Sequence, residues 1–171
     1  MYHSINLEII YLSCPIFKFN DYKKKQERSL LVTNLAVYNV KGTDVKRRIE
    51  VQKIKGISFS KIGTEFILHI PSEYDYRYAS SDLRDRIIYS ILKAYWKVTG
   101  EKLPIYYREE ISLVMYAMTK EDKKKLGPKD IKGKYVLHND ESYQEYLQGQ
   151  EEEKEIVRKT TRTLFARNFE E

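Results

Sequence analysis

The chain has 171 residues, with 31 lysine and arginine residues against 25 aspartate and glutamate residues, a formal net charge of +6 at pH 7. This length predicts one domain with an appendage, not two full domains. The hydrophobic fraction is 42% and the charged fraction is 33%, which favours a globular protein. The sequence has no apolar run of the roughly 18–20 residues that a membrane-spanning helix needs, which excludes a transmembrane protein.

Several kinds of catalytic and metal site lack the residues that they need. Cys14 is the single cysteine, which excludes an intramolecular disulfide and a cysteine metal cluster and fits a reducing, cytoplasmic environment. The first residues lack the basic segment of a signal peptide, so we expect none. No glycine-rich phosphate loop, GxSxG or HExxH motif is present. We therefore predict a protein that is not an enzyme and has no cofactor.

The positive charge is concentrated in the first part of the chain. Residues 18–61 contain twelve basic and four acidic side chains, whereas residues 140–171 contain nine acidic and five basic ones. A basic region of this kind attracts lipid headgroups, nucleic acid or acidic protein surfaces such as those of cytoskeletal polymers. The alternative interpretation is that these side chains only solvate ordinary strand surfaces.

The sequence from residue 29 to residue 71 has the pattern of short antiparallel strands. Residues 29–40 predict two strands joined by a turn at Asn34, and residues 45–51 alternate with period two. Residues 54–60 and 65–70 predict two further strands, the second of which ends at Pro71. Connections of two to five residues favour a meander that curls into a small barrel or sandwich.

The pattern changes to a helical period after residue 80. Apolar residues recur every three or four positions from Asp82 to Thr99, which predicts an amphipathic helix that ends at Gly100. Residues 102–118 predict a strand, then a strand or helix, packed on the core. Thr119 and Asp122 can cap a short helix that Gly127 and Pro128 would end, and residues 140–171 predict a charged, solvated helix.

Four short motifs in residues 16–71 resemble the tail-homology-one domain of class I myosins. They are Ile16-Phe17-Lys18-Phe19-Asn20, the segment from Arg28 to Tyr38, the segment from Ile54 to Ser60, and the segment from Glu65 to Pro71. The resemblance covers residues 16–100, about half of the chain. It implies an α+β fold: a small antiparallel β-barrel or sandwich of pleckstrin-homology type that is closed by a C-terminal helix. In this chain we expect a helical C-terminal extension to follow that domain. These residues depart from that family in having no motor region and no calmodulin-binding neck, so we expect the module alone. We place the domain at residues 1–118 and the extension at residues 119–171.

The resemblance also implies a site for an anionic ligand. In that family, basic residues around the first two strands bind phosphoinositide headgroups, and Lys18 and Arg28 occupy the matching positions. The family's lipid-binding version has another basic residue two positions before the arginine, where this chain has Gln26. Our candidate anion-binding residues are Lys18, Lys23, Lys24, Lys25, Arg28, Lys46 and Arg48.

Two functions remain open from the sequence. In the first, the chain is a cytoskeletal adaptor whose basic face docks on a phosphoinositide-containing membrane. In the second, it is a structural component of a large cytoskeletal assembly such as a ciliary axoneme, where the basic face meets tubulin or another acidic protein and residues 140–171 bind a protein partner. We therefore predict a cytoplasmic protein associated with membrane, cytoskeleton or cilium, and we do not expect nucleic-acid binding, because the strand pattern buries most aromatics near the basic residues.

Overall fold

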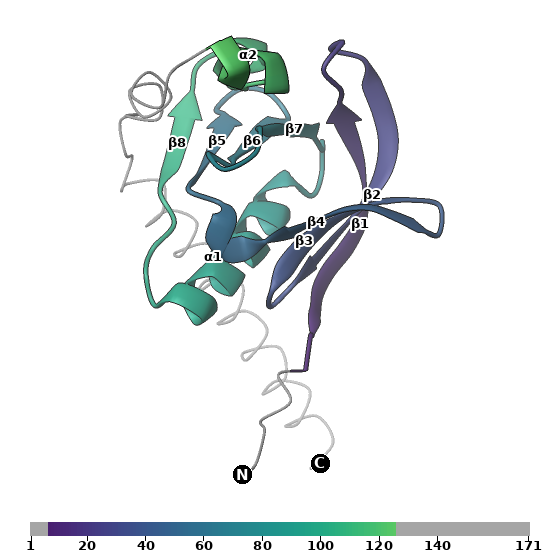
Figure 1. Cartoon of the computed structure of the whole chain (residues 1–171), viewed down its shortest axis with the longest axis vertical. Helices are drawn as coiled ribbons and strands as arrows, with labels where there is room; N and C mark the ends of the chain where they lie inside the picture. The colour runs from purple at the N-terminus through teal and green to yellow at the C-terminus, as the bar shows by residue number, and fades with distance from the viewer. Residues whose placement is uncertain (1–6, 126–171) are drawn as a thin grey trace, which may run out of the picture. The chain divides into compact units, whose positions relative to one another are not determined.

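We describe residues 7–125 of the chain from a computed structural model (Figure 1). The chain divides into two compact units, residues 1–139 and 140–171, and all described residues belong to the first. The predicted helix over residues 140–171 and the predicted stop at Gly127 and Pro128 lie outside the described residues. No helix in residues 7–125 is long and apolar enough to cross a membrane.

The described residues form one eight-stranded sheet with one long helix. The elements are β1 (Ile10–Phe19), β2 (Lys25–Thr33), β3 (Ala36–Lys41), β4 (Asp44–Glu50), η1 (Val51–Lys53), β5 (Gly56–Ser60), β6 (Glu65–His69), β7 (Tyr76–Ala79), α1 (Arg84–Thr99), β8 (Ile105–Arg108), η2 (Val114–Tyr116) and α2 (Lys120–Lys125). The order of the strands in the sheet is β4-β3-β2-β1-β7-β6-β5-β8. The predicted strands and the predicted helix before Gly100 are therefore confirmed.

β1 holds the two halves of the sheet together. It pairs antiparallel with β2 along its whole length, and its last three residues pair with β7. The sheet is thus two antiparallel meanders, β1 to β4 and β5 to β7, joined edge to edge at β1. β8 extends the second meander by pairing parallel with β5. Parallel pairing requires a long crossover, and α1 supplies it.

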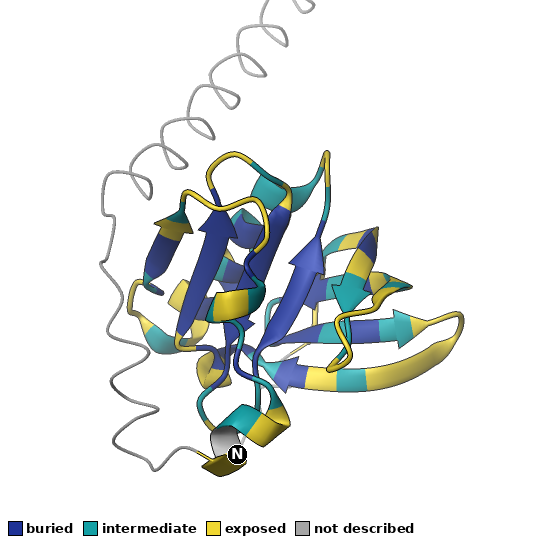
Figure 2. Ribbon diagram, turned by 90° about the horizontal axis from the view of Figure 1, so that it is seen from above, coloured by how far each residue is buried: buried dark blue, intermediate teal, exposed yellow. Residues whose placement is uncertain are grey.

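Period-two alternation decides which side chains enter the core. In β1, Cys14 and Ile16 are buried while their neighbours are exposed, and in β2 Leu30 and Val32 are completely buried. Cys14 pairs with Leu30, so the buried residues of the two strands lie on the same face. We call this face the inner face. Figure 2 shows that burial is continuous through β5, β6 and β7, while the outer parts of β1 to β4 remain exposed.

α1 packs its apolar side against the inner face. The helix buries residues spaced by three and four positions: Ile87, Ile88, Ile91, Ala94 and Tyr95. Gly100 ends it with φ of 69°, and the Gly100 N–H donates to the carbonyl of Trp96. This left-handed conformation is one that glycine adopts without steric cost. Trp96 is 60% exposed, so it does not cover the core.

Residues 109–119, which we call the strap, lie against buried groups of β5, β6 and the β6–β7 turn. The Leu113 N–H donates to Glu65 Oε2 at 2.7 Å, and the Ser60 hydroxyl donates to the carbonyl of Glu110 at 2.6 Å. The Met118 N–H donates to Asp75 Oδ2 at 3.0 Å, and the Asp75 N–H donates to the Met118 carbonyl at 2.9 Å. The strap is therefore fixed by backbone groups at three points.

Asp75 also ends a buried chain of hydrogen bonds. Its Oδ2 lies 2.9 Å from Nδ1 of His69, and Nε2 of the same ring lies 2.6 Å from the Ser58 hydroxyl. The three side chains are almost completely buried, and buried polar groups must be hydrogen-bonded to be stable. His69 is thus a hydrogen-bonded structural residue.

The short helix α2 begins with the predicted cap. The Thr119 N–H donates to Asp122 Oδ2 at 3.0 Å, and the Asp122 N–H donates to the Thr119 hydroxyl at 3.2 Å. This reciprocal pair satisfies two backbone donors that a helix start otherwise leaves without partners. Because Thr119 directly follows the anchored Met118, the cap fixes where α2 begins.

We predict that Asp75→Ala lowers the free energy of unfolding by about 3 kcal/mol, because His69, Ile70 and Met118 each lose a buried acceptor. Urea denaturation measures the change. Asp44→Ala is the control, since this carboxylate is exposed in the β3–β4 turn and its loss should change stability by less than about 0.5 kcal/mol. Equal midpoints for the two variants would contradict the role of Asp75.

We also predict that Gly100→Ala lowers the free energy of unfolding by about 1 kcal/mol. No atom lies within 4 Å of the position of the added Cβ, so the loss comes from the positive φ alone. Gly100→Asn should cost less, because asparagine adopts the left-handed conformation more readily. If Gly100→Ala and Gly100→Asn had the same melting temperature, the positive φ at this position would not be the cause of the lost stability.

Candidate functional site

Lys18 and Arg28 lie at one end of the inner face. In β1, Lys18 follows Cys14 and Ile16 at two-residue spacing, and in β2, Arg28 precedes Leu30 at the same spacing. The register pairs Ile16 with Arg28 and Lys18 with Gln26. The two predicted cations therefore share the face that is apolar farther along the strands. We call this end of the inner face the mouth.

The Lys18 ammonium group is in an unfavourable environment for its charge. Its pKa lies below the ordinary lysine value because burial removes water from it, and because Arg28 and Lys120 repel it, while Asp21 acts in the opposite direction. The ammonium nitrogen lies 5.6 Å from the centre of the Tyr76 ring. A half-buried cation with two cationic neighbours is stabilised by any anion that enters between them.

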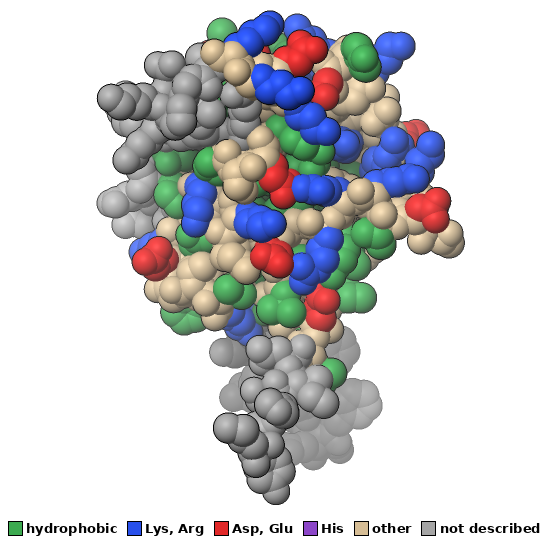
Figure 3. Space-filling model, in the orientation of Figure 1, with side chains coloured by type: hydrophobic (Ala, Val, Ile, Leu, Met, Phe, Trp, Pro, Cys, Tyr) green, Lys and Arg blue, Asp and Glu red, His purple; other side chains and the backbone are tan. Residues whose placement is uncertain are grey.

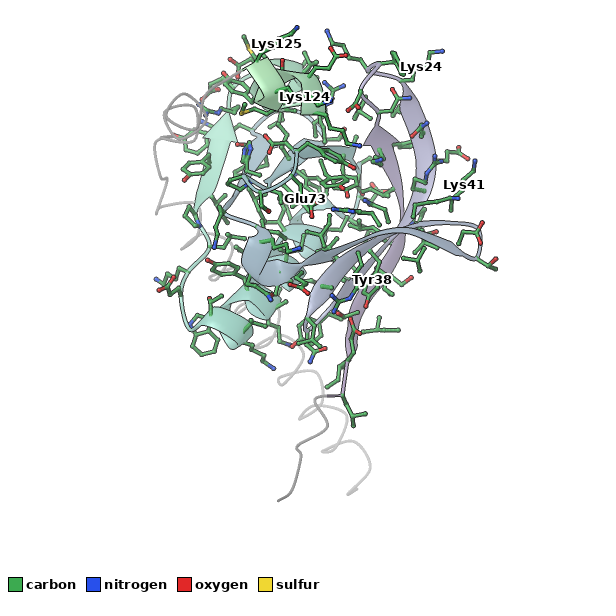
Figure 4. All side chains as sticks on the ribbon, in the orientation of Figure 1. Lys24, Tyr38, Lys41, Glu73, Lys124 and Lys125 are labelled. Carbon is green, nitrogen blue, oxygen red and sulfur yellow. The ribbon has the colours of Figure 1, made fainter. Side chains whose placement is uncertain are left out.

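The third cation of the mouth comes from α2. Lys120 is exposed, and its ammonium nitrogen lies 4.8 Å from the centre of the Tyr74 ring. Lys124 and Lys125 are exposed on the same short helix. Figure 4 shows Lys124 and Lys125 on α2 and Lys24 on the β1–β2 hairpin. Basic side chains gather on this face between α2 and the β1–β2 hairpin (Figure 3).

The β1–β2 loop has a defined conformation. The side chain of Asn20 accepts the N–H groups of Tyr22 and Lys24 at 3.0 and 2.9 Å, and the backbone of Asn20 bonds Lys23 and Lys24. Lys23 has φ of 62°, a left-handed conformation that is rare outside glycine and asparagine. The loop thus presents Lys23, Lys24 and Lys25 as exposed side chains.

Other cations near the mouth are already paired. Arg47 of β4 points to the inner face and forms an ion pair with Glu73, and Lys53 lies 3.8 Å from the same carboxylate. Glu73 raises the pKa of Arg47, chiefly through a hydrogen bond. In the view of Figure 4, Glu73 lies between Lys124 of α2 and Tyr38 of β3. Arg47 and Lys53 thus share one carboxylate partner. Lys18, Arg28 and Lys120 form no ion pair with a carboxylate in residues 7–125.

Lys46 and Arg48, the remaining predicted site residues, lie on the opposite face of β4. Arg48 Nε donates to the Tyr38 hydroxyl at 3.0 Å, and Arg48 also pairs with Glu50 at 3.5 Å. Tyr38 in turn donates to Glu8 at 2.5 Å, and this bond is the main reason that the pKa of Glu8 is lowered. Lys46 lies 3.9 Å from Asp44 within its own strand. The structure does not bring these two residues to the mouth.

Lys120 is the site residue that the sequence did not single out. The capping residues Thr119 and Asp122 predicted the helix, but its lysines have the pattern of a solvated helix surface. Nothing local in the sequence indicates that Asp75, more than 40 positions earlier, holds the start of α2 near the mouth. The rings of Tyr74 and Tyr76 are tilted with centres 4.9 Å apart, and those of Tyr76 and Tyr78 are stacked with centres 6.3 Å apart.

The buried chain from Ser58 through His69 to Asp75 has the order of groups found in serine hydrolases. Ser58 is completely buried and His69 is 1% exposed, so a substrate has no access to either group. The chain of hydrogen bonds is therefore a structural clamp. In residues 7–125 no group of three histidine, cysteine, aspartate or glutamate side chains could hold a metal ion.

Comparison with known proteins gives a family and a fold. The family described as unconventional myosin tail, actin- and lipid-binding, matches residues 2–156. The myosin IA heavy chain of Dictyostelium discoideum is 32% identical over 77 residues, which cover 39% of this chain and 8% of that protein. This chain thus spans a small part of that relative.

Among solved structures, the hSac2 domain from human phosphoinositide phosphatase Sac2 matches with a TM-score of 0.50 and 14% identity, covering 63% of this chain and 81% of that domain. The C-terminal PH domain of pleckstrin matches with a TM-score of 0.46 and 13% identity, covering 52% of this chain and 99% of that domain. Identities this low concern the fold alone.

The predicted family and fold are confirmed. The sheet order and the helix after β7 agree with a fold of pleckstrin-homology type. Domains of this fold and of this family are in general binding modules without catalytic activity. The family's description fits the predicted association with cytoskeleton or membrane, and it names no cilium or axoneme. On the match over residues 2–156, the chain belongs to the unconventional myosin tail family, in its pleckstrin-homology-like tail-homology-one domain.

Proposed function

We propose that this chain is a peripheral membrane module that binds the phosphate groups of an anionic lipid headgroup, such as a phosphoinositide, in the mouth between Lys18, Arg28 and Lys120. The observation that carries the proposal is that Lys18 and Arg28 share one end of the inner face, with Lys120 close enough to repel Lys18. The pKa of Lys18 is lowered by burial and by these two cationic neighbours, in agreement with this arrangement. Arg47 and Lys53, in contrast, both lie beside the carboxylate of Glu73. A phosphate group between the three cations would relieve the repulsion and gain charge-assisted hydrogen bonds.

The basic loop extends this site toward a membrane. Lys23 and Lys24 are exposed in the loop that follows Lys18, and Lys25 is exposed on the outer face of the same hairpin. Each lysine near an anionic surface contributes about 1 kcal/mol of attraction. The mouth would then give preference for a multiply phosphorylated headgroup, and the loop would add less selective attraction. Lys46 and Arg48 stay a prediction as site residues, and our proposal does not depend on them.

A second candidate function is docking on an acidic protein polymer. The family's description as actin-binding supports it, and the same exposed lysines could face an acidic filament surface. In this case residues 140–171 would bind the predicted protein partner, and the predicted extension from residue 119 onward would join the domain to that assembly. Co-sedimentation with actin filaments, run beside the vesicle experiment, tells the two apart.

We predict that the double variant Lys18→Glu, Arg28→Glu weakens binding to phosphatidylcholine vesicles containing phosphatidylinositol bisphosphate by roughly 30-fold or more at physiological salt. Vesicle co-sedimentation of the full chain measures this. The matched control is Lys97→Glu, Lys102→Glu, which makes the same change in net charge at the C-terminal end of α1 and should bind much more tightly than the mouth variant. Equal losses in both variants would show that only the overall charge matters.

We also predict that the pKa of Lys18 rises in Lys120→Gln, because one of the two repelling cations is removed. Binding of the soluble headgroup inositol trisphosphate should raise it as well, because an anion favours the charged ammonium. An NMR titration of the lysine side chains follows both changes. The control variant Lys102→Gln should not change the pKa of Lys18. If neither Lys120→Gln nor the bound headgroup changed the pKa of Lys18, the result would contradict the proposed mouth.

A further inference from the structure

A large aromatic side chain lies exposed at the tip of the most basic loop. Tyr22 is 85% exposed, the highest value among the large hydrophobic residues in the described part of the chain. It stands directly before Lys23, Lys24 and Lys25, all of which are exposed. A tyrosine held in water between charged residues gives up the burial that its ring would gain in a less polar environment.

The tip is held in one conformation. Asn20 accepts the N–H groups of Tyr22 and Lys24, the Lys23 N–H donates to the Asn20 carbonyl at 2.8 Å, and Lys23 takes a positive φ. A turn fixed by four hydrogen bonds, the fourth from the Asn20 N–H to the Lys24 carbonyl, has little conformational entropy left to lose on binding. The exposed ring is therefore presented on a rigid support.

A second aromatic ring lies beside the loop. Phe17 is 38% exposed on the outer face of β1, and the Lys25 ammonium nitrogen lies 4.3 Å from the centre of its ring. Tyrosine and tryptophan rings are enriched where a membrane meets water, and lysine side chains there reach from apolar surface to the headgroups. The combination of exposed aromatic rings and lysines on one hairpin fits this boundary better than it fits a purely aqueous ligand.

The position of the tip agrees with this occupant. Lys18 lies in the mouth on β1, and Tyr22 lies four residues later, beyond the end of that strand. Figure 4 shows Lys24 at the outer end of the β1–β2 hairpin, away from the body of the domain. A lipid headgroup held by Lys18 would thus place the tip against the bilayer from which the headgroup projects.

We propose that Tyr22 inserts into the interfacial zone of an anionic bilayer while Lys23, Lys24 and Lys25 contact the headgroups around it. This inference rests on the proposed membrane function and adds the depth and orientation of docking. It distinguishes a membrane from other sources of the same phosphate chemistry, because a soluble inositol phosphate offers the ring no less polar environment.

The first test compares Tyr22→Ser with Ile10→Ser, using the full chain. Ile10 is 62% exposed at the other end of β1, about 30 Å from the loop by strand geometry. We expect Tyr22→Ser to lower the partition coefficient for vesicles containing phosphatidylinositol bisphosphate by roughly fivefold. Ile10→Ser should bind as the natural chain does, and calorimetry should find inositol trisphosphate bound equally by all three proteins.

The second test places a reporter at the tip. In Tyr22→Trp combined with Trp96→Phe, the only tryptophan is at the tip, because the chain has a single natural one. Its emission should shift to shorter wavelength on vesicle binding, and lipids brominated near the headgroup should quench it more than lipids brominated near the chain end. Inositol trisphosphate should produce neither effect.

The outcomes separate the two proposals. Vesicle binding by the natural chain with no loss in Tyr22→Ser and no quenching of the introduced tryptophan would overturn insertion and leave the membrane function standing. Equal vesicle binding by the natural chain and by Lys18→Glu, Arg28→Glu would overturn the mouth as headgroup site. Absence of vesicle binding by the natural chain would overturn both, and binding to actin filaments that depends on Tyr22 would assign the tip to a protein partner.

Discussion

The arrangement of the candidate site depends on one buried carboxylate. Asp75 accepts hydrogen bonds from the backbone of Ile70 and Met118 and lies against the ring of His69. These contacts join the turn between β6 and β7 to the end of the strap, and α2 begins two residues after Met118. This tie places the capped start of α2 beside the β6–β7 turn, and with it Lys120 near Lys18. A residue with no contact to a ligand thus determines the shape of the mouth.

The domain separates cations with structural roles from cations left for a ligand. Arg47 faces inward, and the neighbouring carboxylate of Glu73 neutralises it. Lys18 faces the same way but has cationic neighbours, and burial lowers its pKa further. Keeping like charges together in a half-buried place costs folding free energy. The rest of the fold must offset that cost, and the burial of the apolar side of α1 against the inner face contributes free energy toward it. Such a cost is typical of binding sites.

The sequence predicts the part of this molecule that local pattern controls. Alternation at residues 45–51, the helical period before Gly100 and the Thr119–Asp122 cap all have a local cause, and the structure contains each of them. The four motifs identify the family, and with it Lys18 and Arg28. The parallel pairing of β8 with β5 and the placement of Lys120 could not be predicted, because they depend on contacts between distant residues. Alternation predicts that Arg48 and Arg47 point to opposite faces, but the pairing of Arg48 with Tyr38 depends on the strand register, which the sequence alone does not give.

Gln26 shows how the chain can depart from a family pattern and still keep a cationic mouth. Its position pairs with Lys18 across β1 and β2, so a basic residue there would face the same end of the inner face. Lys18 already has Arg28 and Lys120 as neighbours, and a further cation directly opposite would lower its pKa more. The third positive charge instead comes from α2, on a segment that Asp75 holds from another part of the fold. The charge of the mouth is therefore distributed over the sheet and the segment after the strap, and its strength depends on the buried clamp as much as on the motif itself.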